Sequence, residues 1–400
     1  MSGYRIGVVL SRDPENKHSW SGTPFYMVRA LRKHGVDVRW IGPKTPPPLL
    51  RAKVVNRLMK TLGRGTFDYY HSKMFAKSYV RSLRKEYQSE GLVDCILAPA
   101  ASTEIARMNF ECPIVYTSDI TLPLVRDYYA DYFGIAYWSI RQGEALEAEA
   151  IRKSRLSLFP SQWAATSAIR DYMAEPDRVA VLPYGANLDE VPPREQILNK
   201  ARNKVCKLLF VGVDWVRKGG SIALETLEEL RKIGVESHLT VVGCIPPIPA
   251  SKYANVTVIP VLDKTDPGQY KQLEQLYLAH DFFLLPTRAE AYGIVFCEAS
   301  AFGLPSLTTA TGGVSGVIRH GINGYLCDVQ SGGIEYARII ADVFLDRRKY
   351  ESLMISSRDE YDHRLNWDVW AESLIAMAER QSILNSGISD RINQSGGAVR

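Results

Sequence analysis

The chain has 400 residues, of which 46% are hydrophobic and 23% are charged, and this balance excludes a disordered or fibrous protein. Its length exceeds what one ordinary hydrophobic core needs and fits two domains of roughly 150–200 residues each. The net charge of +5 is too small to identify a partner, and no run of 18 apolar residues would cross a membrane.

Short apolar runs alternate with helical segments through the first half of the chain, which is typical of a parallel sheet covered by helices. Residues 4–10 predict a buried strand. Thr23 predicts the N-cap of a helix that Gly35 ends, before a second strand at 36–42. We expect further strands at 93–98, 113–117, 156–160 and 179–183, with helices at 144–154 and 161–173.

The same pattern restarts in the second half, after a polar linker at 188–204. A strand at 207–213 is followed by a glycine-bearing loop and a helix at 221–233. Later strands are expected at 237–243, 255–260, 281–286 and 305–309, and helices at 266–280 and 294–302. The chain is therefore predicted to have an α/β fold with two doubly wound parallel sheets, whose ligands bind beyond the carboxyl ends of the strands.

Two glutamates, Glu290 and Glu298, flank the predicted start of the helix at 294–302. Gly293 would let a ligand approach the backbone, and the amide groups of 292–295 would face an anion at the positive end of the helix dipole. A carboxylate at this place can also accept hydrogen bonds from ribose hydroxyls. The alternative interpretation is that both glutamates are solvated surface residues.

A basic turn follows the strand at 207–213, where Arg217 and Lys218 precede a helix. Cations beside helix amides suit a diphosphate group, and they would stabilise the charge that develops when a nucleoside diphosphate departs. The alternative is a basic turn without a ligand.

The run E-A-Y-G-I-V-F-C-E-A-S-A-F-G-L-P-S-L-T-T from Glu290 resembles the E-x7-E signature of retaining GT-B glycosyltransferases, in particular family 4 (glycosyl transferases group 1). The continuation T-A-T-G-G-V-S-G-V-I-R-H-G-I-N-G-Y-L also matches. The basic turn resembles the variant found in relatives of lipopolysaccharide-core glucosyltransferases, because Val213 replaces the usual Arg and Arg217 stands beside Lys218.

The resemblance implies a GT-B fold of two Rossmann-like domains. We expect an acceptor-side domain at 1–188, joined by a terminal crossing helix at 367–383, and a nucleotide-sugar domain at 189–366. The polar, glycine-rich tail at 384–400 is expected to be disordered.

The resemblance also implies the roles of individual residues. Glu290 and Asp119 are the expected catalytic residues. Ser118 replaces a His that many relatives carry beside the Asp, which leaves the acceptor-side chemistry open, and Asp119 could instead cap a helix. The expected donor-binding residues are Gly22, Arg217, Lys218, Tyr292, Gly293, Ile294 and Glu298.

We therefore expect a retaining glycosyltransferase, a hexosyltransferase that moves a sugar from a UDP- or GDP-linked donor to a glycan, lipid-linked or small-molecule acceptor hydroxyl. No D-x-D motif stands in the expected context, so we expect no metal ion and no cofactor beside the nucleotide-sugar co-substrate, and no nucleic-acid partner. Two alternatives share this fold: a nucleotide-sugar epimerase, which would consume donor without an acceptor, and a non-catalytic scaffold.

The segment 44–85 carries eleven Lys or Arg residues against one acid, Asp68. Within it, Leu50, Val54, Leu58 and Leu62 recur every four residues and predict a helix with an apolar stripe bordered by cations. This helix could lie on an anionic bilayer, or it could cover the N-terminal sheet with a solvated basic rim. Because no signal peptide opens the chain, we expect a cytoplasmic protein, either free or at the inner face of the membrane.

Overall fold

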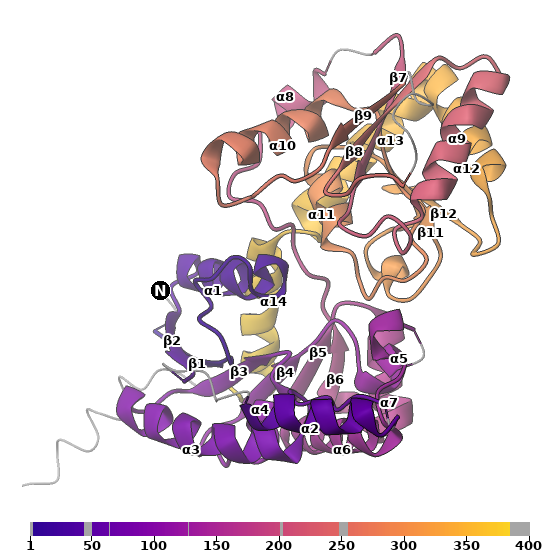
Figure 1. Cartoon of the computed structure of the whole chain (residues 1–400). Helices are drawn as coiled ribbons and strands as arrows, with labels where there is room; N and C mark the ends of the chain where they lie inside the picture. The colour runs from indigo at the N-terminus through magenta and orange to yellow at the C-terminus, as the bar shows by residue number, and fades with distance from the viewer. Residues whose placement is uncertain are drawn as a thin grey trace, which may run out of the picture. The chain divides into compact units, whose positions relative to one another are not determined.

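The computed structural model describes residues 3–43, 50–63, 65–126, 128–200, 203–247 and 255–384. Apart from Leu384, the predicted tail at 384–400 lies outside these residues, as do Lys44 and Arg64 of the basic segment. The chain forms two compact units (Figure 1). Unit 1 comprises Met1–Leu182 and the chain from Trp370 onward, and unit 2 comprises Pro183–Val369.

Unit 1 is built on a six-stranded parallel sheet in the order β2-β1-β3-β4-β5-β6. The predicted strands of the first half are all confirmed: each apolar run supplies one short strand, and β1, β3, β4 and β5 are almost entirely buried. The strands are β1 (Arg5–Val9), β2 (Asp37–Ile41), β3 (Cys95–Pro99), β4 (Ile114–Thr117), β5 (Leu156–Phe159) and β6 (Val179–Val181).

The helices of unit 1 differ from the sequence prediction in two places. The helix expected at 144–154 begins earlier, at Tyr137. Thr23 is not the N-cap of the first helix: that position belongs to Gly22, whose φ of 84° lies in the left-handed region that glycine adopts without steric cost. The helices are α1 (Thr23–Lys33), α2 (Leu50–Thr61), α3 (Lys73–Glu90), α4 (Ser102–Ala106), α5 (Leu122–Arg126), α6 (Tyr137–Lys153), α7 (Gln162–Tyr172) and most of α14 (Trp367–Arg380).

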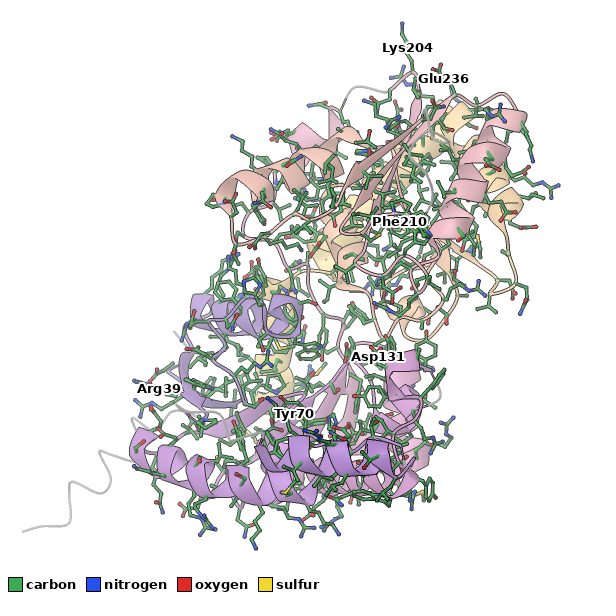
Figure 2. All side chains as sticks on the ribbon, viewed as in Figure 1. Arg39, Tyr70, Asp131, Lys204, Phe210 and Glu236 are labelled. Carbon is green, nitrogen blue, oxygen red and sulfur yellow. The ribbon has the colours of Figure 1, made fainter. Side chains whose placement is uncertain are left out.

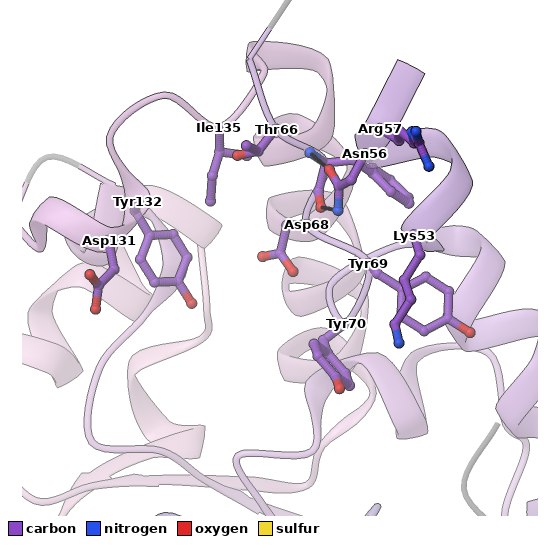
Figure 3. Close-up of a pocket in the computed structure, with 11 residues that line it drawn as sticks. Lys53, Asn56, Arg57, Thr66, Asp68, Tyr69, Tyr70, Asp131, Tyr132 and Ile135 are labelled. Carbon is purple, nitrogen blue, oxygen red and sulfur yellow. Dashed lines mark hydrogen bonds between the residues drawn. The ribbon is translucent and has the colours of Figure 1, made fainter. Parts of the chain in front are cut away.

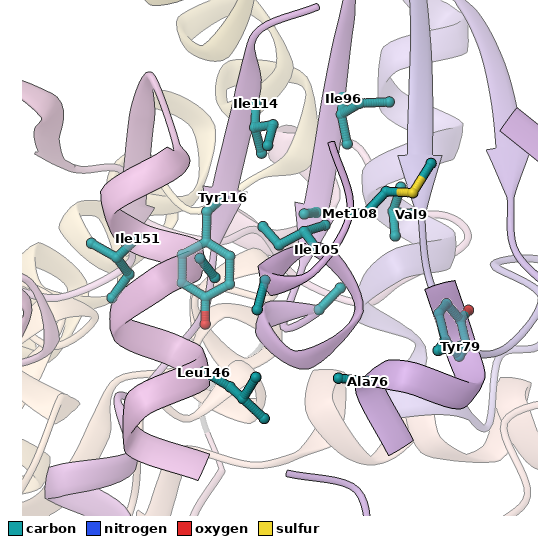
Figure 4. Packing of buried hydrophobic residues seen from close by; sticks show 14 of the residues in the cluster. Val9, Ala76, Tyr79, Ile96, Ile105, Met108, Ile114, Tyr116, Leu146 and Ile151 are labelled. Atoms are coloured by element: carbon teal, nitrogen blue, oxygen red, sulfur yellow. The ribbon is translucent and has the colours of Figure 1, made fainter. Parts of the chain in front are cut away.

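One large buried cluster of unit 1 lies between the sheet and helices that include α3, α4 and α6 (Figure 4). Ile96 and Ile114 from the strands pack with Ile105 from α4 and Leu146 from α6, and all four are buried. Tyr79 of α3 is also buried, and its hydroxyl donates a hydrogen bond of 2.7 Å to the carbonyl oxygen of Leu10. This bond ties α3 to the end of β1, where the loop leading to Gly22 begins.

Unit 2 repeats the architecture with a second six-stranded parallel sheet, in the order β12-β11-β10-β7-β8-β9. The predicted strands are confirmed, and the sheet has one more, β12, that was not predicted. It is an edge strand of four residues, beginning at a glycine and carrying two partly exposed side chains. The strands are β7 (Cys206–Val211), β8 (Ser237–Val242), β9 (Val256–Ile259), β10 (Phe282–Leu285), β11 (Ser306–Thr309) and β12 (Gly324–Cys327).

The interior of unit 2 is densely packed. Figure 2 shows Phe210 of β7 among packed side chains, whereas Lys204 and Glu236 lie at the margin of the unit. The segment predicted as a linker contains a short helix, α8. The other helices of the unit are α9 (Gly220–Lys232), α10 (Pro267–Ala279), α11 (Ile294–Ala301), α12 (Gly333–Leu345) and α13 (Arg347–His363), and α8 spans Arg194–Leu198. None of the described helices is both long enough and apolar enough to cross a bilayer.

Candidate functional site

The basic turn that follows β7 places one of its two cations inside unit 2. The Lys218 ammonium group forms an ion pair with the Glu290 carboxylate, and both side chains are buried. Glu290 comes from the loop after β10, so the pair joins the carboxyl ends of two neighbouring strands. Removal of one partner would leave the other charge buried and uncompensated, which is strongly destabilising.

Arg217 joins the same two loops through its backbone and its side chain. Its carbonyl oxygen accepts a hydrogen bond of 2.7 Å from the Arg288 amide, and its Nη1 donates one of 3.1 Å to the Ala289 carbonyl oxygen. Its Nε also lies 3.6 Å from an Asp214 carboxylate oxygen. The guanidinium is about a quarter exposed, so it keeps donors on the surface beside the buried pair.

Gly219 allows this turn to lie against the end of β10. It is the N-cap of α9 with a φ of 73°, and a Cβ atom added there would overlap the carbonyl oxygen of Pro286. Only glycine combines the left-handed backbone with the missing Cβ. The position of Lys218 therefore depends on its neighbour in the sequence.

We expect Gly219→Ala to lower the free energy of unfolding by clearly more than Gly234→Ala does. Gly234 has a similar φ of 80° but nothing within 4 Å of an added Cβ, so its substitution costs only the left-handed backbone, about 1–2 kcal/mol. Gly219→Ala adds the clash with Pro286, worth about 1–3 kcal/mol more. Urea denaturation measures both, and equal losses would show that α9 does not need this close approach.

The N-terminus of α11 lies next to the buried ion pair in the sequence and is shaped by Gly293. This residue is the N-cap with a φ of 96°, and a Cβ there would overlap the Phe296 ring. The Phe296 amide donates a hydrogen bond of 3.0 Å to the Gly293 carbonyl oxygen. The amide groups that begin a helix point outward along its axis and attract negative charge. Ile294 lies in this turn and is half-buried.

The Tyr292 side chain is hydrogen-bonded within unit 2. Its hydroxyl donates a hydrogen bond of 3.1 Å to the Tyr184 carbonyl oxygen, and burial raises its pKa well above the usual value, so it remains a donor. Its backbone amide, rather than its phenol, is therefore the group that a ligand could use.

Glu298 is almost completely buried in α11, and two side chains hold its carboxylate. Lys264 Nζ lies 2.5 Å from Oε1, and the Tyr277 hydroxyl donates a hydrogen bond of 3.0 Å to Oε2. Burial, followed by the charge of Glu298, raises the pKa of Tyr277 well above its usual value, which keeps the hydroxyl protonated. The sequence analysis missed Lys264, because a single Lys in the loop after β9 has no local pattern that distinguishes it.

The remaining two predicted site residues, Gly22 and Asp119, belong to unit 1. Gly22 precedes α1, and a Cβ there would come within 3.1 Å of the Lys17 carbonyl oxygen. Asp119 follows β4 and is half-buried, beside Ser118, whose hydroxyl donates to the Ile120 carbonyl oxygen at 2.7 Å. Within the described part of the chain, no three His, Cys, Asp or Glu side chains come together as a metal ion would require.

Two family models match the chain: the first covers most of the N-terminal part of unit 1, and the second covers most of unit 2. The model described as Glycosyltransferase Family 4 matches residues 25–190, and the model described as Glycosyl transferases group 1 matches residues 205–346.

Among curated proteins, the chain is similar to D-inositol 3-phosphate glycosyltransferases. It is 26% identical over 251 residues to that of Xylanimonas cellulosilytica, a match that covers 58% of this chain and 59% of the relative. It is 24% identical over 296 residues to that of Corynebacterium efficiens, which covers 70% of this chain and 67% of the relative. The chain thus spans less than two thirds of the first of these relatives.

Solved structures resemble the chain over nearly its whole length. They include sucrose-phosphate synthase from Thermosynechococcus elongatus, with a TM-score of 0.66 at 17% identity, covering 94% of this chain and 98% of that one. WaaG, a glycosyltransferase involved in lipopolysaccharide biosynthesis, has a TM-score of 0.59 at 18% identity and coverages of 94% and 99%. Anabaena HepE in complex with UDP-glucose has a TM-score of 0.56 at 18% identity and coverages of 95% and 100%. These similarities show a shared GT-B fold.

Proposed function

Since the chain belongs to the glycosyltransferases, with a family 4 domain followed by a group 1 domain on the GT-B fold, we propose that it transfers a sugar from a nucleotide sugar to a hydroxyl group with retention of anomeric configuration. In this proposal unit 2 binds the donor and unit 1 binds the acceptor. The observation that carries it is the buried Lys218–Glu290 pair next to the N-terminus of α11.

The diphosphate of the donor binds at the N-terminus of α11, beside the two cations of the basic turn. The amide groups at Gly293 and Ile294, together with Arg217 and Lys218, provide donors for its oxygens. Because an ammonium group has three N–H donors, Lys218 can keep its bond to Glu290 while it contacts a phosphate. These groups stabilise the departing nucleoside diphosphate, where negative charge grows in the transition state, so the transfer needs no metal ion or cofactor.

The two glutamates contact different parts of the donor. Glu290, held by Lys218, lies near the transferred sugar, and Glu298 accepts the ribose hydroxyls. Each Glu298 oxygen has a second lone pair beyond its bond to Lys264 or Tyr277, so both remain able to accept. HepE was solved with UDP-glucose, and this supports a UDP-linked donor.

The acceptor is a hydroxyl group of a glycan, a lipid-linked molecule or a small polyol, oriented by Asp119. The small-polyol class is supported by the relatives named D-inositol 3-phosphate glycosyltransferases. The glycan and lipid-linked classes are supported by WaaG, which takes part in lipopolysaccharide biosynthesis. We also assign Gly22 to the donor-binding residues in this proposal.

An NMR time course tests the stereochemistry. A panel of UDP-, GDP- and ADP-sugars is first screened by thermal shift, and the donor that stabilises the chain is then incubated with candidate acceptors. We expect the first product signal to have the anomeric configuration of the donor. An inverted anomer at first formation would contradict retention, and consumption of donor without any acceptor would indicate an epimerase instead.

A further inference from the structure

Unit 1 contains a cavity of about 610 Å³ that the proposed chemistry does not use. Figure 3 shows Lys53, Arg57 and Tyr69 on one side of it, Asp131 and Tyr132 on the other, and Asp68 between them. The lining therefore comes from α2, from the segment that follows α2 and from the segment before α6.

Helix α2, on one side of the cavity, exposes an apolar stripe. Val54 and Leu58 on the helix are 53% and 57% exposed. Leu62, in the turn just after α2, is 65% exposed and continues the four-residue spacing, because its amide donates a hydrogen bond of 3.1 Å to the Leu58 carbonyl oxygen. Met59, on another side of the helix, is buried in the core of unit 1. The apolar surface of α2 is therefore wider than the part that unit 1 covers.

The segment before α6 and the first turn of α6 also expose large apolar side chains. Phe133, Tyr137 and Trp138 are 63%, 70% and 50% exposed. The strand-like bridge between Thr66 and Ile135 holds them in place, with the Thr66 amide donating to the Gly134 carbonyl oxygen at 2.9 Å.

The two sides are joined through Phe67, so they form one structural element. The Phe67 ring stacks on the Trp138 ring with 5.3 Å between centroids. The Phe67 amide donates to the Asn56 side-chain oxygen at 2.6 Å, and the Asn56 amide group donates back to the Phe67 carbonyl oxygen at 3.1 Å. Val54 and Leu58 therefore lie on a helix, and Leu62 just after its end, and this helix is bonded to the segment that leads to the exposed aromatic rings.

Positive charge accompanies this apolar surface. Lys53 and Arg57 are exposed on α2, and no acidic residue occurs between Leu50 and Phe67 in the sequence. Helix α3 adds five exposed cations, Lys73, Lys77, Arg81, Arg84 and Lys85.

The cavity also contains two carboxylates, Asp68 and Asp131, and Asp68 is hydrogen-bonded to a histidine. Asp68 accepts a hydrogen bond of 2.7 Å from His71 Nδ1. Burial lowers the pKa of His71, but the hydrogen bond and the charge of Asp68 outweigh this effect and raise it. Asp68 therefore has a partner in unit 1, and Lys53 and Arg57 lie on the side of the cavity opposite to Asp131.

We propose that Val54, Leu58, Leu62, Phe133, Tyr137 and Trp138, together with Lys53 and Arg57, form a docking surface for an anionic phospholipid bilayer. An exposed apolar patch bordered by cations is typical of proteins that lie in the interface of such a membrane. Tyr and Trp side chains favour the level of the lipid headgroups, and cations are attracted to anionic lipids. A second copy of the chain fits less well, because pairing this surface with itself would bring like charges together.

The proposal goes beyond the transfer reaction and does not depend on the donor site. Membrane docking also favours a lipid-linked acceptor over the other acceptor classes, and this part of the inference rests on the proposed function. A lipid-linked acceptor would reach unit 1 through the cavity that opens within the docking surface.

Vesicle flotation with the full chain tests the docking surface. The vesicles are phosphatidylcholine with or without phosphatidylglycerol. We expect the chain to float with the anionic vesicles and much less with the neutral ones. Leu58→Glu and Tyr137→Glu should each reduce the bound fraction by about tenfold, because a carboxylate on the docking surface repels anionic lipid and resists insertion. Met173→Glu is the matched control, since Met173 is 83% exposed on unit 1 outside the docking surface, and it should bind like the unaltered chain.

Three results would overturn the proposal, and none of them bears on the donor site. The first is a lack of flotation with anionic vesicles, or equal binding by Leu58→Glu and Met173→Glu. The second is complete displacement by excess inorganic phosphate, which would show that the cavity binds a free anion. The third is a dimer in light scattering that Leu58→Glu dissociates without any change in vesicle binding, which would identify an interface between two copies.

Discussion

Lys218→Met is expected to lower kcat by about 10²–10³-fold, because a donor aimed at the developing charge of the leaving group is lost. Methionine keeps most of the length and the apolar stem of lysine but cannot donate to a phosphate oxygen. The measurement is steady-state kinetics with the donor and acceptor that the panel identifies. KM for the donor should change less than kcat, because the interaction is strongest in the transition state.

The single variant has a structural effect that must be separated from the catalytic one. Without Lys218, the buried Glu290 carboxylate has lost its ion-pair partner, and breaking a buried pair costs about 3–5 kcal/mol. The double variant Lys218→Met/Glu290→Gln removes both charges, so we expect its free energy of unfolding to recover most of this loss. Its kcat should stay low, and a double variant that regains activity would show that Lys218 only neutralises Glu290.

Lys232→Met is the matched control for this series. Lys232 lies at the end of α9 in the same unit and pairs with Glu229, at 2.5 Å, on the surface. Exposed pairs contribute little to stability, so kcat and the free energy of unfolding should both stay close to those of the unaltered chain.

Glu298→Ala is expected to weaken nucleoside diphosphate binding by about 10–100-fold, because hydrogen bonds between a carboxylate and the ribose hydroxyls are lost in a buried site. Inorganic diphosphate has no ribose, so its affinity should be unchanged. Isothermal titration calorimetry with both ligands gives the comparison directly. An equal loss for the two ligands would indicate that Glu298 supports the α11 N-terminus rather than the ribose.

Two further variants refine this prediction. Lys264→Met should weaken nucleoside diphosphate binding less than Glu298→Ala, and Lys264→Arg should restore it, because Lys264 acts by orienting the Glu298 carboxylate. Glu360→Gln serves as the control for a buried glutamate in unit 2: Glu360 pairs with Arg319 and Arg364, so it should affect stability without discriminating between the two ligands.

The sequence by itself determined the alternation of strands and helices and the two-sheet α/β fold. This was possible because strands buried on both faces appear as short apolar runs, and because glycines such as Gly35 and Gly234 end the helices between them. The family could also be recognised from the sequence, because the E-x7-E run is local: it lies within one loop and one helix. The edge strand β12 was not predicted, because a run of four residues that begins at a glycine and has two partly exposed side chains resembles a loop in the sequence.

Only the tertiary structure decided which side chains are partners. The Lys218–Glu290 pair joins residues 72 positions apart, and the Lys264–Glu298 pair joins residues 34 apart. No periodicity links such residues, because their contact depends on strand order in the sheet. The exposure of Val54, Leu58 and Leu62 was undecided for the same reason: an apolar stripe indicates that a helix has a partner surface, but only the packing of the whole unit shows whether the chain itself supplies it.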